Sequence, residues 1–400
     1  MGLMDYIKDI IGFDREHIDS LDAETLAASG SDKWSRYPGC IGAFIAEMDF
    51  GLAPAVQDAI ERATTQCSLG YIPDSWKHNV AVSCAAWQHA RFGWNVDPQC
   101  IHTVPDVLEA YEFFLRDIVG EGHSVLVPTP AYMPFLSVPD LYGVEVVEVP
   151  MLREQHSWQF DFPAIERCFA NGCRALVLCN PHNPIGKVLT AEELQRIIDL
   201  ADRYDARVFA DEIHAPFVFD SHRHIPYASI SPLAARQAFS ATSASKAFNI
   251  PGTKCAQVIL TNPDDVEVWN KRAIWSEHQT ATIGAIATTA AYTEGGPWFD
   301  QVLAYVADNA RLMDQRMRED FPDVDYVSPE GTYIAWLDFN RIGLKDPAQF
   351  FLDHAHVALT DGLGCGEVGA GCVRLNFAMP RPLLNECLDR MRRALDERTA

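Results

Sequence analysis

Short apolar runs alternate with helical patterns through the middle of the chain, and this alternation limits the folds open to it. The runs lie at residues 124–127, 144–149, 175–179, 208–210, 238–241 and 257–260. Residues 192–204, between two of them, have the spacing of a helix. Buried strands separated by helices are typical of a mostly parallel sheet with helices on both faces. We therefore expect an α/β fold.

The length of 400 residues exceeds the usual size of a single hydrophobic core, so we expect two domains. Residues 51–295 contain the alternating pattern and are predicted to form the large domain. Residues 296–400 begin with a long helical pattern and continue with two strand patterns and two more helical ones, which predicts a smaller α+β domain. Residues 1–50 are predicted to form an N-terminal arm that joins this smaller domain. Within the arm, the stretch that begins at Ser20 is expected to open a short helix, and residues 31–37 are expected to be irregular.

Charge and cysteine usage narrow the functional class. The 55 acidic and 32 basic residues give a net charge of -23, which argues against nucleic acid or an anionic membrane as a partner. No stretch is apolar for long enough to span a bilayer, and no secretory signal pattern is evident. The 11 cysteines include no Cys-x-x-Cys pair, which is typical of a reduced protein. We expect a cytoplasmic protein.

One lysine stands out, at the end of the apolar run 238–241. Lys246 follows two serines, Ser243 and Ser245, and a second lysine, Lys254, lies eight residues further on. A lone lysine is most often a solvated surface charge. Burial, however, disfavours the charged form of an amine, which can then act as a nucleophile toward a carbonyl group.

An acid and an amide follow neighbouring apolar runs in the same way. Asp211 comes directly after residues 208–210, and Asn183 follows residues 175–179. In parallel sheets, ligands bind beyond the carboxyl ends of the strands, so Asn183, Asp211 and Lys246 are expected to face one crevice. Asp211 could instead cap the next helix, and Asn183 could simply shape a proline-rich turn.

Two further candidates suit a small-molecule ligand that has an aromatic ring and a carboxylate. Tyr132 lies in the loop Pro128-Thr-Pro-Ala-Tyr-Met-Pro and could stack on a ring, although packing is the commoner role of such a residue. Arg374 lies in a predicted strand, and its planar guanidinium suits a bidentate contact with a carboxylate. Arg374 could equally form an ordinary salt bridge.

A helix predicted to open at Asp106 and Val107 offers free backbone N–H groups and the positive end of its dipole to a phosphate. The Ser243 hydroxyl and the Lys254 ammonium would add to such a site. We expect the Asp106 carboxylate to cap the helix and point away from the phosphate.

Taken together, the motifs resemble a known family. Asn-Pro-x-Asn-Pro-x-Gly, Ala-Asp-Glu-Ile-His, Ser-x-Ser-Lys-Ala-Phe-Asn-Ile-Pro-Gly and Arg-Leu-Asn-Phe-Ala occur in the order seen in fold-type I enzymes that use pyridoxal 5'-phosphate (PLP). Within that group, the chain most resembles the MalY/PatB branch of cystathionine beta-lyases, also called cysteine-S-conjugate beta-lyases. The likeness extends from Met48 over nearly the whole remaining chain.

The resemblance implies a role for each candidate. Lys246 would hold PLP as a Schiff base, Asp211 would pair with the pyridine nitrogen, and Asn183 would bind the ring's 3-oxygen. Tyr132 and Ile213 would cover the two ring faces. Arg374 would bind the substrate carboxylate. The phosphate would contact Asp106, Val107, Ser243 and Lys254. Tyr71 would reach the phosphate across a dimer interface, which implies a homodimer. No metal is implied.

The expected reaction is beta-elimination, in which L-cystathionine or a related cysteine S-conjugate gives a thiol (homocysteine from cystathionine), pyruvate and ammonia. Two departures from the aminotransferases of this fold favour the lyase branch. His214, counted among the residues that contact PLP, stands where many aminotransferases have tyrosine, and Lys254 stands where many have arginine. The phosphate-binding helix also lacks the Ser-Gly type of opening common in aminotransferases.

Three alternatives remain open at this stage. The first is an aminotransferase of the same fold, since the fold does not fix the reaction. The second is a PLP-binding regulator, although no basic helix-turn-helix is visible. The third is a metal enzyme using His222 and His224 or His354 and His356, which lack suitably spaced partners. Candidate walls of the substrate pocket are Trp34, Tyr37 and Trp275, and the glycine-rich loop 361–371 could close it.

Overall fold

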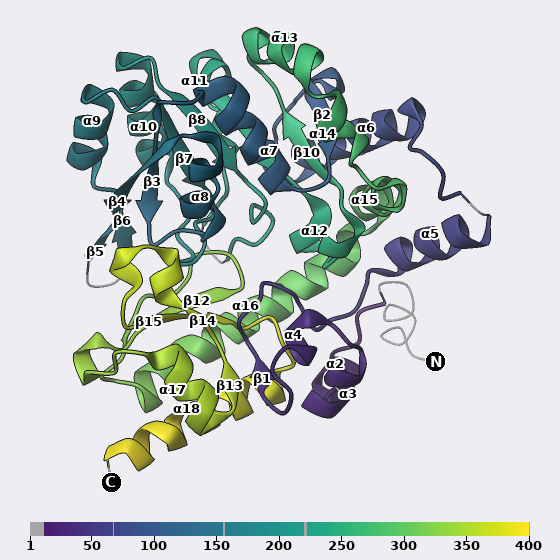
Figure 1. Ribbon diagram of the computed structural model, residues 1–400. Helices are drawn as coiled ribbons and strands as arrows, with labels where there is room; N and C mark the ends of the chain where they lie inside the picture. The colour runs from purple at the N-terminus through teal and green to yellow at the C-terminus, as the bar shows by residue number, and fades with distance from the viewer. Residues whose placement is uncertain (1–11, 67, 155–156, 220–221, 400) are drawn as a thin grey trace.

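A seven-stranded sheet dominates the computed structural model, which describes residues 12–66, 68–154, 157–219 and 222–399 (Figure 1). The strand order is β2-β10-β9-β8-β7-β3-β4. Strands β9, β8, β7, β3 and β4 pair in parallel, whereas β10 is antiparallel to both of its neighbours. The bounds are β2 Ile101–Val104, β3 Ser124–Thr129, β4 Glu145–Pro150, β7 Ala175–Cys179, β8 Arg207–Asp211, β9 Ala238–Thr242 and β10 Ala256–Ile259. The predicted α/β fold with a mostly parallel sheet is confirmed.

Successive residues of these strands belong to two different apolar cores, because side chains alternate between the faces of a sheet. Val125 and Val127 pack with the helix that follows β2, whereas Leu126 packs in the other core. In β7, Val177 packs in the same core as Val125 and Val127, and its neighbour Leu176 packs in the core that contains Leu126. Burial on both faces explains why each strand reads as a continuous apolar run.

Helices cover both faces of the sheet. The predicted helix 192–204 is α10 (Ala191–Arg203), which begins with a capping box between Thr190 and Glu193. The helix predicted from Pro105 starts at Val107 as α7 (Val107–Phe113) and continues as a π-helix, Phe114–Val119. The remaining helices around the sheet are α5 Pro54–Thr65, α6 Asp74–Phe92, α8 Pro134–Ser137, α9 Phe162–Ala170, α11 Pro232–Gln237, α12 Ala244–Ala247, α13 Pro263–Arg272, α14 Ile274–His278 and α15 Thr282–Glu294.

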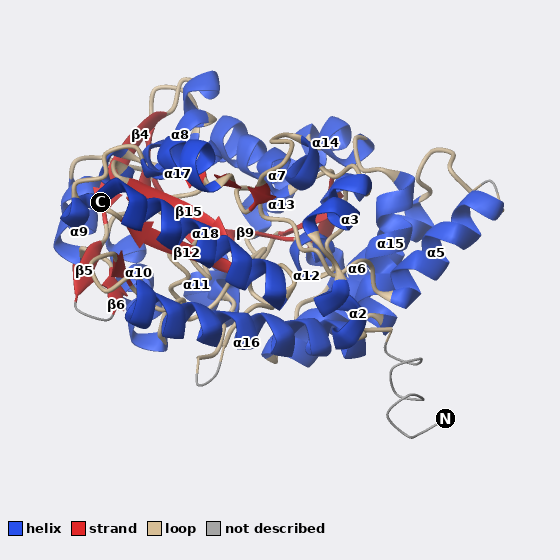
Figure 2. Cartoon of the chain, turned by 90° about the horizontal axis from the view of Figure 1, so that it is seen from below, coloured by secondary structure: helices blue, strands red, loops and turns tan. Residues whose placement is uncertain are grey.

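The C-terminal part has a sheet of its own, in the order β11-β12-β15-β14. Seen from below in Figure 2, α16 (Gly296–Asp320) and α18 (Arg381–Thr399) lie with α17 (Pro347–Ala355) around β12 and β15. The strands are β11 Asp325–Tyr326, β12 Ile334–Asp338, β14 Thr360–Asp361 and β15 Cys372–Asn376, and a separate hairpin is formed by β5 Leu152–Glu154 and β6 Ser157–Gln159. None of the described helices combines the length and apolar character needed to cross a bilayer.

The N-terminal segment docks on this C-terminal part. β1 (Ile41–Gly42) pairs in parallel with β13 (Val357–Ala358). This contact supports the predicted arm, whose residues 1–11 lie outside the described ones. The three-part division at residues 50 and 295 stays a prediction.

Two elements of the arm were not predicted. Residues 31–37 were expected to be irregular but contain the helix α4 (Asp32–Ser35), and the polar stretch after Asp14 forms α2 (Arg15–Ser20). The expected short helix after Ser20 is present as α3 (Ala23–Ala28), capped by Asp22. Helices as short as α2 and α4 carry little apolar periodicity, and this is why these two were missed.

Candidate active site

A cavity of about 740 Å³ lies at the carboxyl ends of the parallel strands and extends to the N-terminal segment and the C-terminal sheet. Eleven of the twelve predicted site residues line it: Asp106, Val107, Tyr132, Asn183, Asp211, Ile213, His214, Ser243, Lys246, Lys254 and Arg374. Tyr71 does not line it. The side chain of Tyr71 is 91% exposed and stacks on His278 at a ring distance of 5.9 Å.

Asp211 is the last residue of β8, and its carboxylate is buried in the cavity wall. The Ile213 backbone N–H donates to Asp211 Oδ1 at 3.1 Å. Burial raises the pKa of Asp211 to about 7, although the nearby Lys246 favours the ionised form. The described residues directly after β8, 212–219, contain a turn at 213–216 and no helix, so Asp211 does not have the capping role considered for it. An acid with this environment can share a proton with a basic nitrogen placed in the cavity.

Lys246 lies in the short helix α12, whose first residue follows the cap Ser243. Its Nζ donates to the Ala46 carbonyl oxygen at 3.0 Å, which fixes the amine at the cavity. Burial and the Arg374 charge lower the pKa of Lys246 to about 8, against the opposing effects of Glu47 and Asp211. An amine that is partly neutral near physiological pH can act as a nucleophile or as a base.

Arg374 and Asn183 contact each other inside the cavity. Arg374 Nη1 donates to Asn183 Oδ1 at 3.2 Å, and Arg374 Nη2 donates to the Phe44 carbonyl oxygen at 2.9 Å. Both acceptors are neutral, and Arg374 takes part in none of the ion pairs found among the described residues. The salt-bridge alternative for Arg374 is therefore wrong. A buried guanidinium held only by neutral oxygens can receive a carboxylate.

The predicted phosphate site lies where α7 begins. Asp106 caps the helix as expected, because its Oδ1 accepts from the Glu109 N–H at 3.0 Å. Its Oδ2 also pairs with Lys254 Nζ at 2.8 Å, a contact that was not predicted. Ser243 Oγ donates to the Cys255 carbonyl oxygen at 2.9 Å. The Lys254 charge is thus held beside the α7 N-terminus, where an anion would meet both.

Two rings complete the inner part of the cavity. Tyr132 packs edge-on against Phe135 at 5.5 Å, and burial raises the pKa of its hydroxyl. His214 is buried, and its Nδ1 contacts no hydrogen-bonding group in the described residues. Burial and the charges of Lys246 and Arg374 lower the pKa of His214 well below its usual value, so the ring is neutral.

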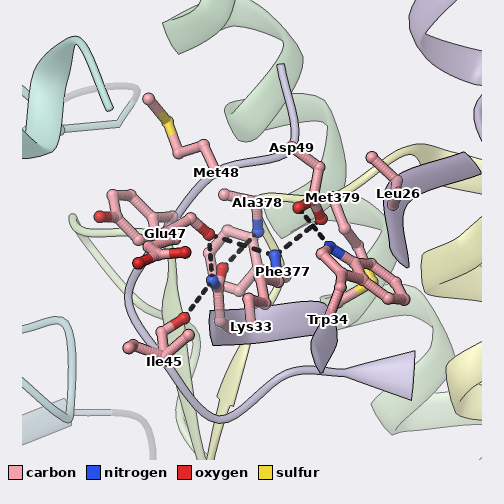
Figure 3. Close-up of polar contacts among 12 residues, drawn as sticks. Leu26, Lys33, Trp34, Ile45, Glu47, Met48, Asp49, Phe377, Ala378 and Met379 are labelled. Atoms are coloured by element: carbon pink, nitrogen blue, oxygen red, sulfur yellow. Dashed lines mark hydrogen bonds and ion pairs between the residues drawn. The ribbon is translucent and has the colours of Figure 1, made fainter. Parts of the chain in front are cut away.

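The outer wall differs from the prediction. Tyr37 lines the cavity, but Trp34 and Trp275 do not. Trp34 is buried and donates from Nε1 to Asp49 at 2.8 Å, as Figure 3 shows, and Trp275 is 72% exposed on α14. The residues that sequence reasoning missed are Arg36 and Glu47. Glu47 directly follows the apolar run 41–46. An acid in this position was the sequence signal that could have marked Glu47 as a candidate site residue.

No group of three or more His, Cys, Asp or Glu side chains within the described ranges could hold a metal ion. His224 is buried and its Nε2 lies 3.8 Å from Glu212, whereas His222 is partly exposed. The structure thus places His224 in the interior beside an acid and His222 at the surface.

Comparison with known proteins defines the class. Residues 51–391 match the family model of aminotransferases of class I and II, so the chain belongs to this family. One relative is the cystathionine beta-lyase of Corynebacterium glutamicum, which is 32% identical over 92% of this chain and 98% of that protein. Another is the cystathionine beta-lyase PatB of Bacillus subtilis, which is 30% identical over 93% of this chain and 98% of that protein. A solved Corynebacterium diphtheriae structure, provisionally named a PLP-dependent beta-cystathionase, matches with a TM-score of 0.89 and 36% identity over 94% of this chain and 98% of that one.

Proposed function

We propose that this protein is a PLP-dependent carbon–sulfur beta-lyase that cleaves L-cystathionine or related cysteine S-conjugates to a thiol, pyruvate and ammonia. The observation that carries the proposal is the meeting of Lys246, Asp211 and Arg374 in one cavity of a chain whose relatives bear the lyase name. A nucleophilic amine, a buried acid and a carboxylate-binding cation are the groups this chemistry needs.

The residues present fit the cofactor. No cationic side chain among the described residues is in hydrogen-bonding contact with the buried Asp211, and a protonated ring nitrogen would supply one. Asn183 Oδ1 accepts from Arg374, and its Nδ2, for which the described residues provide no acceptor, would donate to the ring's 3-oxygen. Tyr132 and Ile213 would cover the ring faces, with His214 beside them. The first N–H groups of α7, Ser243 and Lys254 would hold the phosphate.

In this arrangement each side chain has a defined task. Arg374 binds the substrate carboxylate and so orients the α carbon. Lys246 Nζ removes the α proton, for which its lowered pKa suits it. Asp211 keeps a proton on the ring nitrogen, and the bound cofactor supplies an electron sink for the charge left at the α carbon. Loss of the thiolate from the β carbon then completes the elimination, and the thiolate takes up a proton to give the thiol. The three-carbon enamine that is released reacts with water to give pyruvate and ammonia.

The proposal includes a homodimer in which Tyr71 contacts the phosphate in the neighbouring subunit's site. Support comes from the high exposure of Tyr71 and its absence from the cavity of its own chain. We also propose a cytoplasmic location, because the ten described cysteines are all free thiols.

The test is direct. Purified protein incubated with L-cystathionine is expected to release pyruvate without an added keto acid, and Lys246→Ala is expected to lower kcat by at least about a thousandfold. Lys271→Ala, at an exposed lysine of α13, is the matched control and should keep full activity. Amino transfer that depends on a keto acid, without pyruvate release in its absence, would establish the aminotransferase alternative instead.

A further inference from the structure

Four charged side chains that line the cavity have no task in the reaction just described: Arg36, Glu47, Asp346 and Asp361. Two of them, Arg36 and Glu47, belong to the N-terminal segment. Arg36, directly after α4, and Glu47, on the loop 45–49, line the same cavity as Lys246 and Arg374. The charge of Asp32 acts on both, because Asp32 pairs with Arg36 at 2.5 Å and also raises the pKa of Glu47. Residues 36–37 and 44–47 of the N-terminal segment line the cavity and form one wall of it.

Glu47 is held at this wall through its backbone. Its carbonyl oxygen accepts from Lys33 Nζ at 3.1 Å and from Asn376 Nδ2 at 2.6 Å. Figure 3 shows its carboxylate turned away from the pair formed by Lys33 and Asp49. No described residue donates a hydrogen bond to the Glu47 carboxylate, although the side chain is only partly exposed.

This unpaired state has a cost. Burial is the main reason that the pKa of Glu47 lies above its usual value, and the positive charges of Lys33 and Lys246 offset only part of the effect. Both lysines have other partners: Lys33 pairs with Asp49 at 2.7 Å, and Lys246 donates to Ala46. A cationic group brought in by a ligand would offset the remaining cost.

Arg36 lies further out on the same wall. Its guanidinium carbon is 5.2 Å from the centre of the Phe44 ring, and the Phe44 carbonyl oxygen accepts from Arg374. Phe44 thus connects the inner arginine with the outer one. Arg36 donates to Asp32 through Nε and Nη2, which leaves Nη1 available. Its side chain is about half exposed, so a ligand can reach it.

We propose that Arg36 and Glu47 form a second amino-acid subsite, which binds the carboxylate and the ammonium group at the far end of the sulfur substituent. The inference rests on the proposed lyase function and names its substrate class: thioethers or disulfides that carry an α-amino acid on both sides of the sulfur, such as L-cystathionine. Arg374 binds the near carboxylate and Arg36 binds the far one.

The physical basis is the asymmetry between a paired and an unpaired charge. A far-end ammonium pairs with Glu47, whereas an alkyl group at the same place removes water from this carboxylate without replacing the contact. Sites with polar groups of this kind reject analogues that lack the matching group. The subsite therefore selects against apolar S-substituents.

The test compares two substrates with the same carbon–sulfur bond, L-cystathionine and S-ethyl-L-cysteine. The ratio of their kcat/KM values is expected to fall about tenfold in Glu47→Gln and in Arg36→Gln, because each loses one far-end contact. Arg153→Gln, at an arginine of β5 outside the cavity, is the matched control and should keep the wild-type ratio. Asp32→Asn frees Arg36 and is expected to maintain or raise the ratio.

Equal losses on both substrates, or an unchanged ratio, would overturn the second subsite. A wild-type protein that releases pyruvate from neither substrate would overturn the lyase function and not the subsite. In that case, calorimetry measures the binding of both compounds to Lys246→Ala protein and to the Lys246→Ala/Glu47→Gln double variant. If the subsite exists, Lys246→Ala protein binds L-cystathionine more tightly than S-ethyl-L-cysteine, and Glu47→Gln weakens the binding of L-cystathionine. Thermal unfolding midpoints confirm that each variant is folded.

Discussion

Lys246 and Asp211 both shift toward their neutral forms in the cavity. Each charge favours the ionised state of the other, yet burial is the larger effect at both residues and sets the direction of both shifts. The folded chain therefore carries an acid and an amine whose ionisation costs free energy until a ligand pairs with them. Such a pair is more stable with a bound ligand than without one.

Asp211→Asn should change how the stability of the cofactor-free protein depends on pH. The folded-state pKa of about 7 exceeds the unfolded value of 3.8, so the folded state binds more protons between these values. The stability that Asp211 contributes is complete below about pH 4 and is lost as pH rises toward 7. The variant should thus be more stable than wild type at about pH 8, by on the order of 2–4 kcal/mol, and nearly equal at about pH 4.

Urea unfolding of both proteins at the two pH values measures this difference. The comparison cancels the titration of Lys246 to the extent that the two sites do not couple. A difference that is the same at both pH values would show that the Asp211 carboxyl does not titrate in this range.

The site residues that sequence revealed share one property: they follow buried strands or lie in proline-rich turns. Asn183, Asp211 and Lys246 were placed in one cavity because parallel strands end at one edge. Arg36 and Glu47 lie 210 and 199 residues before Lys246, on a segment whose docking depends on tertiary contacts. No local pattern shows which wall such a segment forms.

At the scale of elements, the loop 45–49 is held on both sides by side-chain hydrogen bonds. Its Met48 backbone exchanges two hydrogen bonds with the Asn249 side chain, at 2.9 and 2.8 Å. Asn376, at the end of β15, donates to the Ile45 and Glu47 carbonyl oxygens. The loop therefore links the turn after Lys246 to the C-terminal sheet and holds the Ala46 oxygen against the Lys246 amine.

Lys33→Met should destabilise this connection strongly. Lys33 and Asp49 form an ion pair at 2.7 Å with almost no solvent exposure, as Figure 3 illustrates. Removing the lysine leaves a buried carboxylate without its cation, which costs about 3–5 kcal/mol. Denaturant unfolding should also show that Lys33→Met/Asp49→Leu recovers much of this loss. Lys271→Met, which breaks an exposed pair, should change stability by less than about 1 kcal/mol. Similar effects of the two lysine variants would contradict the argument.

Gly284→Ala should disturb the packing of α15 against the turn that carries Lys254. A Cβ at Gly284 would lie 2.1 Å from the Thr253 carbonyl oxygen, so the backbone must move. We expect a loss of about 1–3 kcal/mol, measured by denaturant unfolding, and weaker binding of inorganic phosphate. Gly252→Ala has open space around it and no positive φ angle, so it should be nearly neutral. Equal stability of the two variants would mean that the helix and the turn separate easily.

The positions of most long helices and strands could be predicted from sequence. Whether a strand runs parallel or antiparallel to its neighbours could not. The strand patterns at 175–179 and 238–241 match β7 and β9 to within one residue, because continuous apolar runs mark buried strands. Nothing in the run 257–260 shows that β10 is antiparallel to its neighbours. The hairpin β5–β6 was missed because all three residues of its first strand lie on the surface and carry no apolar alternation.

At the scale of the whole molecule, an acidic surface carries an exposed apolar cluster. The side chains of Leu69, Tyr71, Ile274 and Trp275 are 52–91% exposed. Tyr71 stacks on His278 of α14, and Trp275 packs edge-on against the same histidine. Large apolar side chains gathered on a protein surface are typical of an interaction site. In a homodimer, this cluster would face the partner.

A shared site predicts that two inactive variants restore each other. Lys246→Ala removes the amine from its own site, and Tyr71→Ala removes the tyrosine from the neighbour's site. A mixed dimer then contains one site with both residues intact and one with neither. Unfolding and refolding an equal mixture, with cofactor present, should restore about a quarter of wild-type activity, because half of the dimers are mixed and each has one complete site. Tyr71→Phe mixed with Lys246→Ala tests whether the hydroxyl is needed. Activity no greater than the sum of the separate variants, in a mixture shown by light scattering to be dimeric, would place Tyr71 outside the neighbour's site.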